Sequence, residues 1–231
     1  MIEHCISIAI MIIALIAIKF IMGIKIKKIK ELAGRTDLDV LTEKLPNSEE
    51  MAKSILKKLK NENVNIKKSV DEKNETSLYI VLSNTIILGK MENKYARVQT
   101  IAHECLHSIQ NKKILWFNYI YSNLYIIYFW ISIILTVTKV FTATTFNLYL
   151  LILFGLIWYV VRSYLEMDAM IKAPFLAKEY LKENNLSDKD IDTLIKSYDE
   201  INNQSIPATN YGLLMQVLLR CIVYALIAII C

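Results

Sequence analysis

The sequence predicts a mainly α-helical membrane protein with about four transmembrane helices and a small α+β domain outside the bilayer. Hydrophobic residues make up 55% of the 231 residues, and they are concentrated in long blocks instead of being spread evenly. A block of about 20 apolar residues is long enough to cross the hydrocarbon core of a membrane. The polar segments between these blocks combine amphipathic helical patterns with short stretches typical of strands, which predicts the α+β domain.

Four apolar blocks define the predicted transmembrane helices. The first, residues 5–24, lacks a basic segment before it and a small-residue cleavage site, and it is too long for a signal peptide. The blocks at 114–137 and 146–161 are separated by a short loop and predict a transmembrane hairpin. The last block, 211–231, contains Arg220, which either lines a polar cavity or lies at the interface of a shifted or shortened helix. The predicted segments are 1–24, 25–113, 114–161, 162–210 and 211–231.

The distribution of basic residues predicts the orientation in the membrane. Basic side chains follow the first helix, precede the second and follow the third, whereas the loop at 138–145 has only Lys139. By the positive-inside rule, segments 25–113 and 162–210 face the cytoplasm, and both termini and the loop face outward. This clustering also explains the net charge of +5 better than a nucleic-acid partner does. The basic residues concerned are Lys25, Lys27, Lys28, Lys30, Arg35, Lys112, Lys113 and Arg162.

The two polar segments contain several expected elements. Residues 47–61 have the periodicity of an amphipathic helix, with Asn47 or Ser48 as its N-cap. The stretch from 77 to 90 contains strands, either at the edge of a small sheet or inside it. We also expect a strand at 64–69 and helices at 94–110, at 164–184 with a kink or interruption at Pro174, and at 186–201 with Ser187 as its cap.

The stretch TIAHECLHSIQ, residues 100–110, contains His103, Glu104 and His107 in the order H-E-x-x-H. Residues four apart share one face of a helix, so both imidazoles can bind a single ion. Glu104 then lies beside the ion, where it can accept a proton from a water molecule. A random chain of this length would contain the pattern roughly one time in a hundred. The apolar stripe lies on another face and comprises Val98, Ile101, Ala102, Cys105, Leu106 and Ile109.

A catalytic zinc ion needs a third protein ligand and one open position. His4 is the only other histidine, and the predicted topology places it on the opposite side of the membrane. We therefore expect a carboxylate ligand, and Glu166 is the first choice because the hairpin returns the chain to the side that carries His107. Asp168 is either the ligand instead or a hydrogen-bond acceptor that orients a ligating imidazole. Cys105 is interpreted as a small buried apolar residue and not as a ligand.

These residues carry a family resemblance. The stretch LSNTIILGKMENKYARVQTIAHECLHSIQ, followed beyond the hairpin by EMDA, resembles the neutral zinc metallopeptidases of bacterial membranes, the YugP-like family. The resemblance covers roughly residues 40–185 and implies a zincin-like domain with a gluzincin-like set of ligands. Cys105 and Leu106 depart from the expected Val and small residue, at positions that do not coordinate metal. Carried over by position, the zinc ligands are His103, His107 and Glu166, the general base is Glu104, and Gln110 matches the glutamine that follows the motif.

The function expected from these observations is that of a membrane-integral zinc endopeptidase acting at the cytoplasmic face on membrane proteins or peptides. A prenyl-protein or quality-control type of membrane peptidase would share this chemistry. The alternative is a catalytically silent zinc-binding membrane scaffold or interaction protein. Glu104 favours the enzyme, because a structural site needs no base and normally closes the fourth coordination position with protein. The sequence does not choose an oxyanion-stabilising residue among Arg162, Tyr164 and Tyr211.

Overall fold

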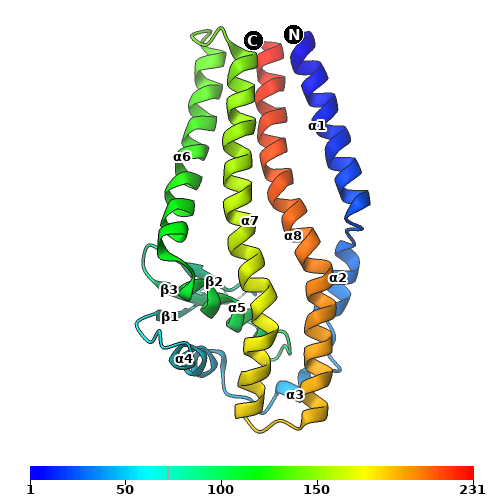
Figure 1. Cartoon of the computed structure of the whole chain (residues 1–231), viewed down its shortest axis with the longest axis vertical. Coiled ribbons are helices and arrows are strands. Elements are labelled where there is room, and N and C mark those ends of the chain that lie inside the picture. The colour runs from blue at the N-terminus through cyan, green and yellow to red at the C-terminus, as the bar shows by residue number, and fades with distance from the viewer. Residues whose placement is uncertain (72) are drawn as a thin grey trace. The chain divides into compact units, whose positions relative to one another are not determined.

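The computed structural model describes residues 1–71 and 73–231 (Figure 1). The mainly helical fold with one small sheet that the sequence predicts is confirmed. Among the described residues, four helices are long and apolar enough to cross a membrane. These helices are α1 (Ile2–Ile21), α6 (Lys112–Val137), α7 (Thr144–Glu183) and α8 (Asp188–Ile230).

The chain divides into two compact units, which we name the membrane unit and the polar unit. Helices α7 and α8 contribute residues to both of them. The membrane unit consists of Met1–Ile24, Trp116–Tyr164 and Pro207–Cys231, and the polar unit of Lys25–Leu115 and Leu165–Ile206.

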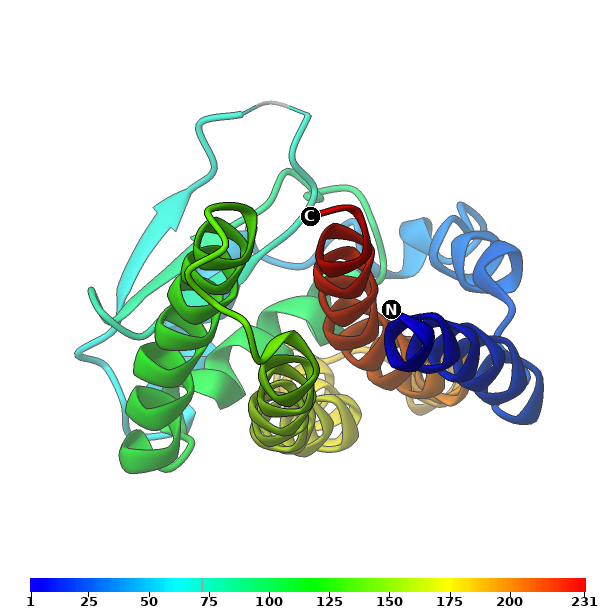
Figure 2. The same cartoon turned by 90° about the horizontal axis from the view of Figure 1, so that it is seen from above.

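The membrane unit is a bundle in which α1 lies next to α8 and α6 lies next to α7 (Figures 1 and 2). Its core includes Tyr125, Leu148 and Val217, while other large apolar side chains of its helices remain exposed. Gly155 permits close approach of the helices, because a β-carbon there would overlap Val217 and the Tyr125 hydroxyl. Both termini and the loop between α6 and α7 lie at one end of this unit (Figure 1).

The polar unit contains a three-stranded sheet in the order β1-β3-β2. Strand β3 (Thr85–Leu88) is central and pairs in parallel with β1 (Asn65–Lys68) and antiparallel with β2 (Leu78–Ile80). The predicted stretch 77–90 therefore supplies both an edge strand and the internal strand. The remaining helices of the unit are α2 (Ile26–Ala33), α3 (Asp39–Thr42), α4 (Ser48–Lys58) and α5 (Arg97–Ile109).

Helix α5 packs against α4 and the sheet through the predicted apolar stripe. Cys105 is fully buried there, in agreement with its interpretation as a core residue. Ile109 departs from the prediction, because it is 45% exposed at the last residue of the helix. At the opposite end, the Arg97 guanidinium donates to the carbonyls of Thr42 and Leu45, at 2.9 and 3.2 Å. These contacts fix the start of the helix that carries the histidines.

The predicted caps of two helices are confirmed. The side chain of Asn47 accepts hydrogen bonds from the backbone N–H groups of Glu49 and Glu50 at the start of α4. The hydroxyl of Ser187 accepts from the backbone N–H of Asp190 at the start of α8. Each cap satisfies donors that the first turn of a helix leaves without an intrahelical partner.

Of the two predicted effects of Pro174, a kink or an interruption, the structure excludes the interruption, because α7 is continuous from Thr144 to Glu183. A proline has no N–H to donate to the carbonyl four residues earlier, which here belongs to Met170. The side chain of Asn202 in α8 donates to this carbonyl at 2.8 Å, and Asn202 in turn accepts from Gln99 in α5 at 2.6 Å. A neighbouring helix thus supplies the missing hydrogen bond.

Candidate metal centre

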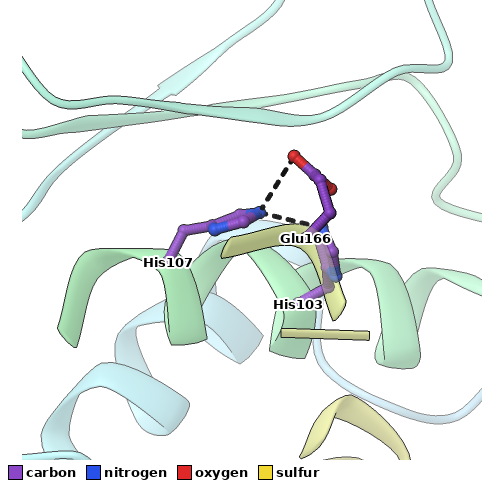
Figure 3. Close-up of side chains that lie close together, drawn as sticks. All are labelled: His103, His107 and Glu166. Carbon is purple, nitrogen blue, oxygen red and sulfur yellow. Dashed lines mark hydrogen bonds and ion pairs between the residues drawn. The ribbon is translucent and has the colours of Figure 1, made fainter. Parts of the chain in front are cut away.

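Helix α5 presents His103, Glu104 and His107 close to the polar-unit part of α7, which supplies Glu166 (Figure 3). Glu104 and His107 are buried, at 6% and 7% exposure, whereas the His103 and Glu166 side chains retain 19% and 13%. The three ligand candidates are His103, His107 and Glu166. They lie up to 63 residues apart in the sequence, and the structure brings their ligand atoms close together.

The ligand atoms of His103, His107 and Glu166 all lie within 4.8 Å of one another. The two histidine Nε2 atoms are 3.0 Å apart, and they lie 3.5 and 3.8 Å from the two carboxylate oxygens of Glu166. Ligands about 2.0–2.1 Å from a tetrahedral zinc ion are separated by roughly 3.3 Å. The observed spacing and the chemistry of the donor atoms therefore fit a zinc ion held by three protein ligands.

Gln110 determines which nitrogen of His107 carries the ring proton. Its Nε2 lies 2.7 Å from the Leu165 carbonyl and 3.1 Å from Asp168 Oδ2, and both of these groups are acceptors. The amide must therefore direct its NH₂ towards them and its Oε1 towards His107 Nδ1, at 2.9 Å. His107 then donates from Nδ1 and presents the lone pair of Nε2 to the ligand cluster.

Asp168 lies outside the cluster and acts on it through Gln110. It accepts from Gln110 and forms an ion pair with Lys172, one helical turn further along α7. Burial acts to raise the pKa of Asp168, but the hydrogen bonds from Lys172 and Gln110 outweigh it and lower this pKa overall. Of the two alternatives for Asp168, the geometry favours the orienting residue. Sequence reasoning missed Lys172, although its i,i+4 spacing from Asp168 is the pattern of a helical ion pair.

Glu104 lies beside the cluster, with its Oε1 4.0 Å from His103 Nε2. Burial raises the pKa of this carboxyl group above its ordinary value, against the opposing effects of the two histidines and of a hydrogen bond with the Tyr79 backbone. The contact with Tyr79 links Glu104 to the edge strand β2. A raised pKa makes a carboxylate a stronger base, which suits a group that accepts a proton.

The other residues considered from the sequence lie elsewhere. His4 is buried in α1 of the membrane unit, and Arg162, Tyr164 and Tyr211 also belong to that unit. Burial raises the pKa of the Cys105 thiol, which disfavours the thiolate that a metal ligand would require.

Comparisons of the chain with protein-family models, with curated proteins and with solved structures find no match. The fold and the site define a mainly helical protein whose described residues include four candidate membrane spans and a His–His–Glu cluster that could hold a metal ion.

Proposed function

We propose that this protein is a membrane-integral zinc metallopeptidase that hydrolyses peptide bonds, of the type represented by the YugP-like family. The observation that carries the proposal is the convergence of His103, His107 and Glu166 at zinc-ligand spacing, with Glu104 beside them. A zincin-like site needs these parts: two histidines one helical turn apart, a distant carboxylate and an adjacent base.

Each residue has a distinct role in the proposed reaction. A zinc ion in such a site supplies a Lewis acid, which polarises the scissile carbonyl and lowers the pKa of water. Glu104 accepts the proton of the attacking water and delivers it to the leaving amine. Gln110 keeps His107 in the tautomer that can coordinate metal. Glu104 is buried, so its carboxyl group has little contact with bulk water.

The edge strand β2 is the proposed docking position for the substrate backbone. Among the described residues it pairs with β3 alone, so its other edge is the side on which an extended peptide could add. The hydrogen bond between the Tyr79 backbone and Glu104 connects this strand to the proposed base. A peptide added to β2 would therefore pass close to the group that transfers the proton.

The proposed compartment follows from the charge pattern. Lysines are dense at the start of the polar unit, in the segment from Lys25 to Lys30, and the α6–α7 loop has only Lys139. The positive-inside rule then supports a cytoplasmic polar unit and substrates at the inner membrane face, either peptides or membrane proteins.

The substitution Glu104→Gln tests this function. Purified wild-type protein is expected to contain about one zinc per chain and to cleave a quenched-fluorescent peptide library in detergent. The variant should retain zinc and lose at least about 10²-fold in activity, because it keeps the ligands and lacks the base. Glu62→Gln, which changes an exposed glutamate, is the matched control and should behave as wild type. Equal cleavage by wild type and Glu104→Gln, or cleavage by neither with zinc retained, would instead support the zinc-binding scaffold.

A further inference from the structure

The membrane unit contains a cavity of about 350 Å³ that the proposed peptidase chemistry does not use. Helices α6, α7 and α8 line it, and several of its side chains are polar although it lies among membrane-spanning segments. The residues that matter for its chemistry are Asn118, Ser122, Trp158, Gln216 and Arg220.

Arg220 is held in this cavity between two aromatic rings. Its guanidinium carbon lies 5.5 Å from the ring centroid of Tyr125 and 5.6 Å from that of Trp158. The indole of Trp158 is fixed in turn, because its Nε1 donates to the Ser122 hydroxyl at 2.8 Å. One guanidinium nitrogen, Nη1, is buried and has no hydrogen-bond partner among the described residues. The aromatic rings stabilise the positive charge, but they leave this donor unsatisfied.

The membrane unit supplies no counter-ion for Arg220. Glu3 is its only acidic side chain, and neither Trp116–Tyr164 nor Pro207–Cys231 contains an aspartate or a glutamate. Glu3 already accepts a hydrogen bond from Thr145 at 2.8 Å. An arginine within a membrane normally pairs with an anion or faces water, because an uncompensated charge there is costly. An anion that pairs with Arg220 would therefore come from outside the unit.

The position of the cavity indicates where that anion comes from. Arg220 lies ten residues before Ile230, the last residue of α8, which corresponds to about 15 Å of helix or half the thickness of the hydrocarbon core. Side chains on a helix lean towards its N-terminus, which brings the guanidinium towards Gln216 and Leu213 on the same face. Arg162, which follows the apolar block of α7, also lines the cavity. The cavity thus extends from the membrane interface into the core.

We propose that this cavity binds the phosphate of an anionic membrane lipid, with Arg220 as its charge partner. The planar guanidinium can donate two parallel hydrogen bonds to phosphate oxygens, and the unsatisfied Nη1 provides one of these donors. The side-chain amides of Asn118 and Gln216 can donate to the remaining oxygens. Lipid phosphates lie at the membrane interface, where Arg162 and Leu213 line this cavity, so a lipid is the anion best placed to enter it. The proposal does not depend on peptidase activity.

Quenching of tryptophan fluorescence by brominated lipids tests the proposal, because Trp158 lines the cavity. The full-length protein is titrated in mixed micelles with brominated phosphatidylglycerol or with brominated phosphatidylcholine. In the wild type, brominated phosphatidylglycerol should quench the tryptophan fluorescence at a mole fraction about tenfold lower than brominated phosphatidylcholine requires. A tenfold difference corresponds to the free energy of one charge-assisted contact. Trp158→Phe should lose this selective component. Equal quenching of the wild type by the two lipids would overturn the proposal without recourse to any variant.

Variants then assign the preference to Arg220. Arg220→Gln should abolish the preference for phosphatidylglycerol, and Arg220→Lys should weaken it, because lysine keeps the charge without the planar pair of donors. Lys19→Gln removes an exposed cation of the same unit outside the cavity and should leave the preference intact. The preference should also persist in Glu104→Gln. If millimolar inorganic phosphate removed it, the site would take free phosphate and the lipid assignment would be wrong.

Discussion

An imidazole can coordinate a metal through Nε2 only when its proton resides on Nδ1. For His107 this condition is met by a side chain outside the ligand set, since Gln110 Oε1 lies 2.9 Å from Nδ1. Gln110 cannot rotate its amide without placing its carbonyl oxygen against the Leu165 carbonyl and Asp168. The glutamine that follows the H-E-x-x-H motif thus has a physical role in this structure, which is to set the tautomer of His107.

Replacement of Gln110 by leucine should weaken zinc binding about 10- to 100-fold, the usual effect of losing a residue that orients a ligand. The His107 ring would lose its acceptor, and the Leu165 carbonyl would lose its donor. Zinc affinity is measured by competition with a chromogenic chelator in detergent. Ile109→Ala, a change to the exposed neighbouring residue, is the control and should leave affinity unchanged. Wild-type affinity in Gln110→Leu would exclude the orienting role.

The zinc contents of two variants, Glu166→Ala and Asp168→Ala, distinguish the roles of these residues. Glu166→Ala should lose most of its zinc on dialysis, because it removes one of the three atoms gathered within 4.8 Å. Asp168→Ala should retain zinc at saturating concentration and bind it more weakly, since Asp168 reaches the cluster only through Gln110. Elemental analysis of both purified variants gives the answer. Full occupancy in Glu166→Ala, with loss in Asp168→Ala, would exchange their roles.

At the scale of elements, a hydrogen bond between α8 and α7 explains how α7 stays continuous with a proline inside it. The Met170 carbonyl, which Pro174 leaves without a helical donor, receives the side chain of Asn202, and Gln99 of α5 holds Asn202 in place. Both amide side chains are buried. This chain of hydrogen bonds connects the helix that carries Glu166 with the helix that carries both histidines.

The substitution Asn202→Leu should destabilise the protein by about 0.5–1.5 kcal/mol, because it removes the part-buried hydrogen bond that the Met170 carbonyl accepts. Part of that cost should disappear in a Pro174→Ala background, where residue 174 regains an N–H that can donate to the same carbonyl. Thermal unfolding of the four proteins in detergent, followed by circular dichroism, measures this coupling. Strictly additive shifts in the unfolding midpoint would show that Asn202 does not compensate for the proline.

Local patterns predicted where helices occur but not where they join: the helices expected at 146–161 and 164–184 form the single helix α7, and those expected at 186–201 and 211–231 form α8. Contacts between distant residues could not be predicted from local patterns either. Asn47 as a cap and Cys105 as a core residue follow from their own neighbourhoods in the sequence. The continuity of α7 depends on Asn202, a residue 28 positions after Pro174, and no local rule connects the two. Gln110 donates to the backbone carbonyl of Leu165. Any residue at position 165 has such a carbonyl, so the residue type could not predict this contact. Glu166 could be predicted only because the scarcity of histidine and the membrane hairpin limited the choice.

At the scale of the whole molecule, the orientation in the membrane decides which substrates can reach the proposed site. The described residues contain four candidate spans, and both termini and the α6–α7 loop lie at one end of the membrane unit (Figure 1). The lysines that follow α1 favour a cytoplasmic position for the start of the polar unit. This orientation predicts that both termini and the α6–α7 loop face outward, and that prediction can be measured.

Cysteine labelling tests this orientation, because Cys105 and Cys221 are buried while Cys5 and Cys231 are exposed. In a Cys5→Ser background, a membrane-impermeant maleimide applied to spheroplasts should label Cys231. With Cys231 also changed to Ser, Thr142→Cys in the loop should be labelled in the same way, whereas Lys28→Cys should react only after permeabilisation. All three positions are exposed, so differences in labelling report the side of the membrane and not burial. Labelling of Lys28→Cys alone in intact spheroplasts would place the proposed peptidase site on the outer face, with extracytoplasmic substrates.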